Sequence, residues 1–420
     1  MLIEFRVANF RSIRDRQALT LVAGPGKELD TANTFEPGVA GFERLLRSAV
    51  IYGPNAGGKT NLLLALQSMQ TLVVNSAIAS QQGNPLPYMP FKLAKEARDA
   101  PSEFEITFIA DGVRYEYGFS VDAVKFHNEW LIAYPHDRPQ KLFERSYHTK
   151  SASYEWSFSS NLRGSRKLWR DATRGNALFL STAVQLNSAQ LLPVFRWFQQ
   201  RLVVIASATQ FNPTLTLKLL DRPDGKEKVL GLLRAADLGI SDVAVRREPL
   251  LPGAPVQGIV YVENSGGAAA QMVVKVTSLH QAADRSDQVS FDLAEESHGT
   301  QILFQTAGAW LNVLANGEVL LVDELDTSLH PLMTRFLVGL FHDTATNPRN
   351  AQLVFTTHDT SLLDSTLFRR DQIWFVEKMR TGATKLFPLS DFSPRKEEAL
   401  ERGYLKGRFG GLPFISELIS

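Results

Sequence analysis

The feature that most constrains the fold of this chain is a glycine-rich segment, GPNAGGKT, at residues 53–60. It follows an apolar stretch at residues 48–52 that predicts a strand, and it precedes a helical pattern from Asn61 to about Val74. A strand, a glycine loop and a helix in this order form a phosphate-binding loop, because loop N–H groups and the positive helix end surround an anion. The segment therefore predicts a nucleotide site at Gly53, Pro54, Asn55, Ala56, Gly57, Gly58, Lys59, Thr60 and Asn61.

A second motif, EVLLVDE at residues 318–324, predicts where the metal and the reacting water lie. It is an apolar strand with two carboxylates at its carboxyl end, where the ligands of parallel sheets bind. A strand that merely ends in solvated acids has the same pattern, so the assignment depends on the phosphate-binding loop. With that loop, we expect Thr60 and Asp323 to bind magnesium and Glu324 to polarise the attacking water, while Lys59 reaches the β- and γ-phosphates. The two motifs therefore predict a nucleotide with Mg²⁺, and the resemblance described below implies that the nucleotide is ATP.

Two further segments are weak signals when each is taken alone. Ser297, His298 and Gly299 precede an apolar helix that begins near Thr300, and a serine at this position is also an ordinary helix cap. His358 follows an apolar strand at residues 352–356, and a lone histidine is more often structural than catalytic. These residues gain meaning only from their order with the two stronger motifs.

Composition excludes several other classes of protein. The 420 residues include no cysteine, which excludes disulfide scaffolds, cysteine-bound metal centres and thiol nucleophiles. The 45 basic residues nearly balance the 44 acidic residues, so the formal charge is +1 and does not favour nucleic acid as the dominant ligand. The longest apolar runs are far shorter than the roughly 20 residues of a membrane-spanning helix. We expect a cytoplasmic protein that does not bind membranes.

The order of these motifs resembles that of the ABC-type ATPase head. In this resemblance Ser297 and Gly299 belong to the signature motif, Asp326 lies in the D-loop and His358 is the switch histidine. More than two hundred residues separate Lys59 from Ser297, and residues 9–12 read NFRS. Both features resemble the SMC/RecF/OLD branch, and within it the single-chain ATPases of bacterial defence and toxin–antitoxin-type operons, such as the ATPase subunit of PARIS-type anti-phage systems.

The resemblance implies an α/β fold with a mixed parallel sheet, an antiparallel β sub-lobe and a helical and β insertion between the Walker A and signature motifs. The expected segments are residues 1–75 and 296–420 for the two parts of the ATPase head, residues 76–177 for the antiparallel sub-lobe and residues 178–295 for the insertion. Within these segments the pattern predicts helix from Leu178 to about Gly239. It also predicts another helix between the strands at residues 352–356 and 372–376.

The resemblance also implies a mechanism and partners. Ser297 and Gly299 would cap the γ-phosphate of ATP held by a second copy, so ATP would join two heads in a two-fold homodimer or larger oligomer. Glu324 and His358 are the expected catalytic residues, and Arg11 and Gln185 are candidates for a phosphate contact and for the Q-loop. A sensor or scaffold role in anti-phage defence is expected, in which the chain controls an effector such as a nuclease. The effector would be separately encoded, because the tail after His358 is short and its acidic residues are scattered.

The alternative is a RecF-like ATPase that binds DNA for repair. Its support is a basic stretch at residues 163–170 with an interleaved tryptophan, Trp169, together with Lys141 and Arg145. A solvated basic loop has the same pattern. A transporter ATPase is disfavoured by the long spacing between Lys59 and Ser297.

Overall fold

The computed structural model describes residues 1–79, 81–135, 138–205, 213–236, 239–249, 260–263, 272–284, 287–392 and 399–412. The chain divides into two compact units. The first comprises Met1–Ala206, Gly317–Leu325 and Val338–Ser420, and the second comprises Ser207–Asn316 and Asp326–Leu337. The predicted fold class is confirmed, since the chain has a mostly parallel sheet, an antiparallel sheet and a helical and β insertion.

The first unit contains a six-stranded sheet in the order β11-β16-β17-β5-β18-β19. The first five of these strands are parallel, and β19 is antiparallel to β18. The strands predicted at residues 48–52, 319–322 and 352–356 are confirmed as β5, β16 and β17. The bounds in sheet order are Leu202–Ile205, Val319–Val322, Gln352–Thr356, Ser48–Tyr52, Ile373–Lys378 and Thr384–Pro388.

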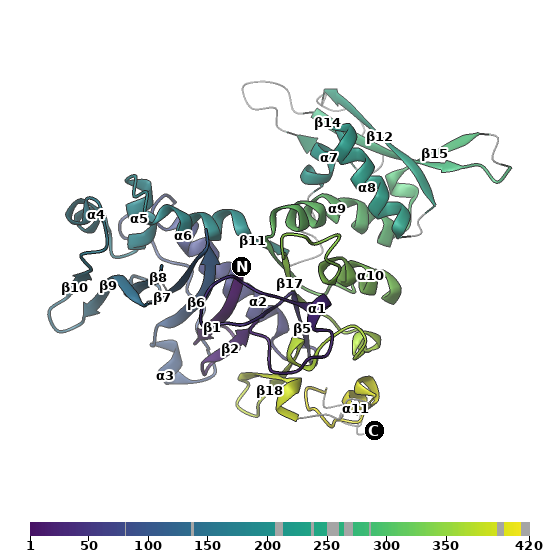
Figure 1. Cartoon of the computed structure of the whole chain (residues 1–420). Helices are drawn as coiled ribbons and strands as arrows, with labels where there is room; N and C mark the ends of the chain where they lie inside the picture. Colours follow the sequence, from purple (N-terminus) through teal and green to yellow (C-terminus); the bar gives the residue numbers. More distant parts are fainter. Residues whose placement is uncertain are drawn as a thin grey trace, which may run out of the picture. The chain divides into compact units, whose positions relative to one another are not determined.

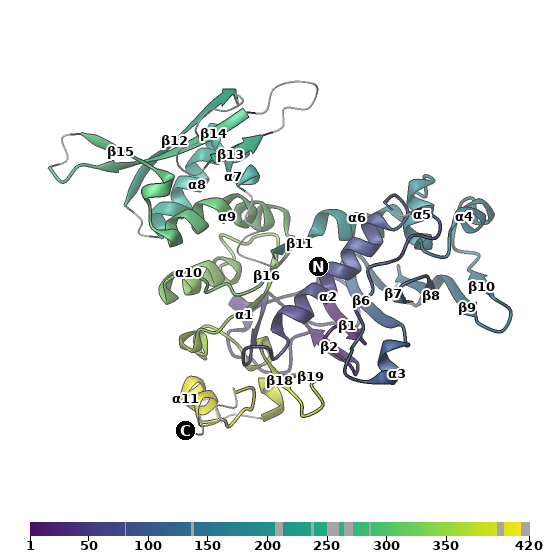
Figure 2. The same ribbon diagram turned by 180° about the vertical axis from the view of Figure 1, so that it is seen from behind.

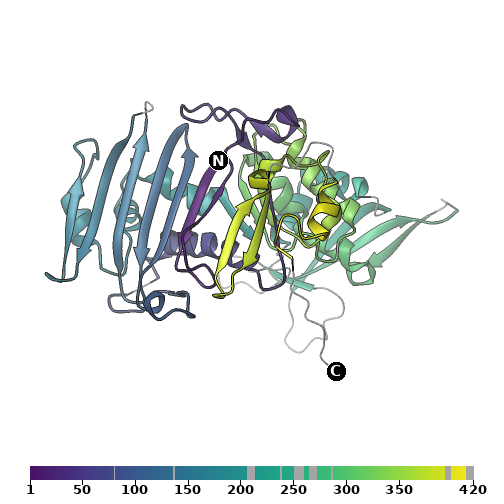
Figure 3. The same ribbon diagram turned by 90° about the horizontal axis from the view of Figure 1, so that it is seen from below.

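A seven-stranded antiparallel sheet in the same unit has the order β10-β9-β8-β7-β6-β1-β2, and Figure 3 shows its strands side by side. Strand β1 pairs with β6, so the first strands of the chain belong to this sheet and not to the parallel one. The predicted Asp111-Gly112 hairpin turn between β6 and β7 is confirmed, because both residues have positive φ and Ala110 pairs with Val113. In chain order, the bounds of β1, β2, β6, β7, β8, β9 and β10 are Leu2–Ala8, Gln17–Thr20, Ser102–Ala110, Val113–Val121, Phe126–Tyr134, Gln140–His148 and Ser153–Phe158.

Helix α2 (Lys59–Asn75) joins the cores of the two sheets. Its side chains Leu62, Leu66 and Met69 are buried in one hydrophobic cluster with residues of both sheets, including Ile51 of β5 and Ile106 of β6. Because burying each large apolar side chain contributes about 1.5–3 kcal/mol, this shared core holds the start of α2 in a fixed place. Figures 1 and 2 show α2 beside β1 and β6 from opposite sides.

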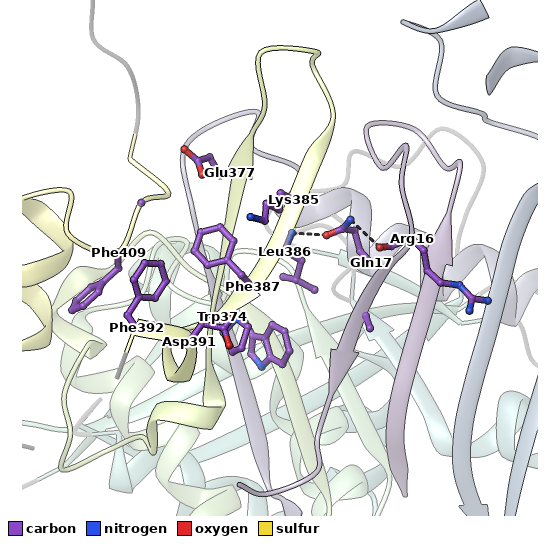
Figure 4. A pocket seen from close by; sticks show the side chains of 13 residues that line it. Arg16, Gln17, Trp374, Glu377, Lys385, Leu386, Phe387, Asp391, Phe392 and Phe409 are labelled. Carbon is purple, nitrogen blue, oxygen red and sulfur yellow. Dashed lines mark hydrogen bonds between the residues drawn. The ribbon is translucent and has the colours of Figure 1, made fainter. Parts of the chain in front are cut away.

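The edge strands of the two sheets meet where β2 approaches β19 (Figure 4). The N–H groups of Thr384 and Leu386 donate to Ser12 O and Gln17 Oε1, both at 2.7 Å, and Pro388 has no N–H to offer. This edge of β19 is therefore closed to a further strand. A groove of about 660 Å³ lies along the junction, with Trp374, Phe387, Phe392 and Phe409 in its wall.

The prediction of helix from Leu178 to about Gly239 is confirmed in part, since helices lie at Phe179–Gln185, Leu192–Arg196, Thr214–Leu220 and Pro223–Ala235. It is wrong at Leu202–Ile205, which forms strand β11 and pairs in parallel with β16. The helix predicted between the strands at residues 352–356 and 372–376 is wrong. Between β17 and β18 the chain forms only 3₁₀ turns, at Thr360–Leu362 and Arg370–Gln372. The side chain of Asp359 accepts the Ser361 N–H (2.9 Å), and such local bonds compete with helix formation.

The second unit combines helices with a small antiparallel sheet. The central strand β14 (Met272–Gln281) pairs with β12 (Ile240–Pro249), β13 (Val260–Glu263) and β15 (Gln288–Asp292). Helix α7 packs closely on α9 at Gly308, where a Cβ atom would lie 2.1 Å from Thr216 N. The helices of this unit are α7 (Thr214–Leu220), α8 (Pro223–Ala235) and α9 (His298–Asn316), and α10 (Pro331–His342) begins there.

None of the helices in the described ranges is long and apolar enough to cross a membrane. The remaining elements of the chain are short. They are α1 (Asp30–Asn33), β3 (Thr34–Phe35), β4 (Leu45–Leu46), α3 (Lys95–Arg98), α4 (Arg166–Ala172), α5 (Phe179–Gln185), α6 (Leu192–Arg196), a π-helical turn at Trp197–Arg201, 3₁₀ turns at Leu293–Glu295 and Leu389–Phe392, and α11 (Leu400–Leu405).

A buried ion pair between Glu129 and Arg145 connects the antiparallel sheet to α5. Both side chains are fully buried, with 2.9 Å between Arg145 Nη2 and Glu129 Oε2. The carboxylate also accepts the Tyr117 hydroxyl and the N–H groups of Phe179 and Leu180, which start α5. A negative charge at this helix end is favourable, and every one of these donors would be left without its acceptor if Glu129 were removed.

We expect Glu129→Ala to lower the free energy of unfolding by about 3–5 kcal/mol, because it leaves the Arg145 charge buried and unpaired. Denaturant unfolding followed by fluorescence measures this loss. Glu144→Ala is the control, since the exposed Glu144–Lys141 pair should change stability by about 1 kcal/mol or less. Equal losses in the two variants would contradict the assignment.

Candidate functional site

Three parallel strands bring the predicted motifs of the first unit to one edge of the sheet. Strand β17 lies between β16 and β5, with Val322 opposite Phe355 and Thr356 opposite Ile51. The carboxyl ends of parallel strands meet at the same edge. The loop after β5, the carboxylates after β16 and the histidine after β17 therefore converge.

The glycine loop has the geometry of a phosphate-binding loop. Gly53 and Gly58 have φ of +155° and +111°, and a Cβ atom on either would lie 2.5 Å or less from Val376 O or Thr384 Oγ1, respectively. Only glycine meets both demands. Helix α2 begins at Lys59, two residues before the predicted start, and the buried Lys59 Nζ donates to Gly53 O (2.9 Å) and Pro54 O (3.3 Å). The ammonium group thus lies inside the loop.

Side chains from both ends of the chain fasten this loop, and we call Ser12, Asn61 and Thr384 the loop clamp. Thr384 Oγ1 donates to the Gly57 carbonyl (2.9 Å) and lies 2.7 Å from Ser12 Oγ, which also accepts from Asn61 Nδ2 (2.7 Å). Asn61 is a predicted site residue, whereas Ser12 and Thr384 are not. Ser12 belongs to the NFRS segment, so its signal was present, whereas Thr384 has none in the sequence.

Thr356 at the end of β17 connects the two carboxylate residues after β16. Its Oγ1 donates to Asp323 Oδ1 (2.6 Å) and accepts the Glu324 N–H (2.7 Å). Glu324 itself has φ of +51°, a conformation that most residues avoid. The Thr356 hydroxyl helps to hold the chain in this conformation, and no pattern in the sequence predicts this role.

His358 lies near Glu324 in the first unit. Its Nε2 is 3.9 Å from Glu324 Oε1, and both side chains are accessible, at 38% and 53% exposure. The next residue is anchored, because the Tyr52 hydroxyl donates to Asp359 O (3.2 Å). Both His358 and Glu324 can therefore be reached from solvent.

The donors fit a magnesium ion that is shared with a nucleotide. In the ranges that the structure describes, no group of three or more His, Asp or Glu side chains forms a metal site of its own. Thr60 stands in the first turn of α2, and Asp323 offers carboxylate oxygen. Magnesium prefers oxygen ligands and is commonly held by one or two protein side chains plus substrate phosphates.

The predicted signature residues lie in the second unit. Ser297 caps α9, since its Oγ accepts the Thr300 N–H (3.1 Å), so the ordinary cap role holds there. Gly299 packs against Ser328, since a Cβ atom on the glycine would lie 2.8 Å from Ser328 O. Ser297 and His298 are exposed, which leaves the positive end of a 19-residue helix accessible.

Two further residues are nominated from the sequence, Gln185 for the Q-loop and Arg11 for a phosphate contact. Gln185 ends α5 and is exposed, and that helix contacts α2 and α4. Arg11 is exposed beside the loop clamp, with its N–H bound to Met89 O (2.7 Å). In the NFRS segment Asn9 is structural, because its side chain binds Ala97 O and Ala100 O, both at 2.7 Å.

Two residues nominated for DNA binding are not available for it. Arg145 is fully buried in its pair with Glu129, so its prediction as part of a basic surface is wrong. Trp169 is only 3% exposed and packs near Phe179, because residues 166–172 form helix α4 rather than a loop. A buried indole cannot stack on a nucleic acid base.

Thr384→Val should raise the dissociation constant for a fluorescent ATP analogue about fivefold, because the loss of one neutral hydrogen bond to the loop is worth about 1 kcal/mol. Thr381→Val is the matched control, since Thr381 is exposed in the same hairpin. An unchanged affinity in Thr384→Val would show that the clamp does not shape the loop.

The chain was compared with known proteins. No curated protein sequence matches it. Among solved structures, "Crystal structure of the SmcHead bound to the C-winged helix domain of ScpA" has a TM-score of 0.44 and 12% identity, and the match covers 92% of this chain and 97% of that one. Residues 48–364 match the family model described as "AAA domain, putative AbiEii toxin, Type IV TA system". This match covers more than half of the chain and contains every motif residue from Gly53 to His358, so the chain belongs to that AAA-domain family.

Proposed function

We propose that the chain binds and hydrolyses ATP, and that two copies associate around two ATP molecules. The observation that carries the proposal is the convergence of the Lys59 loop, Asp323, Glu324 and His358 at one sheet edge, joined through Thr356. Membership of the AAA-domain family supports the choice of ATP.

Each residue has a chemical task in the proposed reaction. The loop N–H groups and the Lys59 ammonium bind the phosphates, and the clamp keeps the loop in shape. Magnesium, held by Thr60 and Asp323, would neutralise charge that develops on the phosphates. Glu324 orients the attacking water and accepts its proton, and His358 donates a hydrogen bond to the γ-phosphate.

A second copy completes the site in this proposal. Ser297 and the exposed start of α9 form an anion-binding end that is suited to a γ-phosphate. Reciprocal use of the same surface by two copies gives a two-fold dimer, which is the commonest closed assembly. ATP then favours the dimer, and hydrolysis releases it.

The dimer is proposed to control a separately encoded effector, such as a nuclease, in a defence or toxin–antitoxin-type system that resembles PARIS. The family description, which refers to a toxin of a type IV system, supports this setting. The burial of Arg145 and Trp169 weakens the DNA-repair alternative.

Glu324→Gln should hydrolyse ATP at least about a hundredfold more slowly and accumulate as an ATP-bound dimer, because it retains the loop but lacks the base. Light scattering with and without ATP, together with phosphate release, measures both effects. Lys59→Ala is the comparison variant and should neither bind ATP tightly nor dimerise. Turnover of ATP at the wild-type rate in Glu324→Gln would contradict the proposed role of Glu324.

Thr356→Val should lower kcat roughly tenfold to a hundredfold, because it leaves Asp323 and Glu324 without their shared hydroxyl. Thr356→Ser keeps the hydroxyl and should stay close to wild type. The affinity for magnesium-free nucleotide should not change in either variant, since Thr356 does not belong to the loop. Equal kcat values in the Val and Ser variants would argue against this role.

A further inference from the structure

Glu296 lies directly before Ser297, the predicted signature serine, and its side chain is held by strand β14 of the second unit. We call the sheet of β12, β13, β14 and β15 the arm sheet. Ser278 Oγ donates to Glu296 Oε1, and His280 Nε2 lies 2.6 Å from the same oxygen. Ser278 and His280 stand two residues apart on β14, so they face the same side of the sheet. We call Ser278, His280 and Glu296 the signature latch.

The latch is well enclosed. The Glu296 side chain is 12% exposed and the His280 side chain 24% exposed. The His280 ring meets Phe291 of β15 edge to face, with 5.2 Å between the ring centroids. Two side chains of β14 thus hold the carboxylate, Phe291 of β15 packs against one of them, and a displaced β14 would carry Glu296 with it.

The backbone of Glu296 is tied to α9 at the same time. Gln301 Nε2 donates to Glu296 O (2.9 Å), and the Gln301 N–H donates to Ser297 O (3.0 Å). The turn before it is closed by Asp292, whose side chain accepts the Ala294 N–H (2.9 Å). These bonds are local, whereas the Glu296 carboxylate reaches 16 and 18 residues back along the chain to β14. The latch therefore joins the signature motif to the central strand of the arm sheet.

We propose that Glu296 is a positioning residue that sets the place of Ser297 through β14. The arm sheet β12-β14-β13, with β15, is then coupled to the signature motif through Glu296, so that loss of this link weakens ATP-driven association. This inference rests on the proposed function, in which Ser297 caps the ATP of a second copy. Figure 2 shows β12, β14, β15 and α9 in the same unit.

The first measurement tests the latch without ATP. Hydrogen exchange of the amides at residues 297–301 should speed up in Glu296→Ala and in His280→Ala, because the start of α9 loses its anchor. Glu296→Gln should stay close to wild type, since its amide oxygen still accepts from Ser278 and His280. Unchanged exchange in both alanine variants would overturn the latch.

The second measurement tests its consequence in the Glu324→Gln background. Glu296→Ala and His280→Ala should weaken ATP-driven dimerisation about tenfold, while the affinity of each copy for ATP changes by about twofold at most. Glu155→Ala is the matched control, because it removes an exposed Glu–His pair, with His148, at a similar 2.7 Å.

The outcomes separate the two proposals. Wild-type dimerisation in the latch variants, beside faster exchange, would overturn the positioning role. A Glu324→Gln protein that stays monomeric with ATP would overturn the proposed dimer, and the exchange experiment would still decide whether β14 holds the motif. Weaker dimerisation with unchanged ATP affinity supports the latch.

Discussion

The site of the first unit depends on the register of three parallel strands. The pairs Val322–Phe355 and Thr356–Ile51 determine how far each strand projects at its carboxyl end. A shift of one residue would turn every side chain to the opposite face of the sheet. Thr356 would then no longer reach Asp323 and the Glu324 N–H, and Glu324, the proposed water-orienting residue, would lose its support.

The loop also depends on segments from the two ends of the chain. Ser12 lies between the first two strands and Thr384 begins the last, yet both meet the loop in one hydrogen-bonded chain. The antiparallel sheet and the parallel sheet share their core through α2, so the clamp is fixed from both sides. This arrangement explains why the first and last strands accompany a nucleotide loop that is far from both in sequence.

Strand positions with continuous apolar character were predictable, because burial on both faces leaves a strong pattern. This applies to β5, β16 and β17. The turn at Asp111-Gly112 was also predictable, because these two residue types tolerate the positive φ values that the turn requires. The short strand β11 was missed because Leu202 also fits the helical spacing before it. Arg145 and Trp169 were read as surface residues because charge and aromatic patterns do not reveal a buried partner.

Local patterns in the sequence predict the phosphate site. A glycine loop with Lys59 and Thr60, and a strand that ends in Asp323 and Glu324, are patterns whose physical demands can be met by few other residues. The residues that support these patterns are visible only in the folded chain. Thr356, Thr384 and the signature latch act through hydrogen bonds between separate segments of the chain. Such contacts follow from packing and strand register, which no local sequence pattern records.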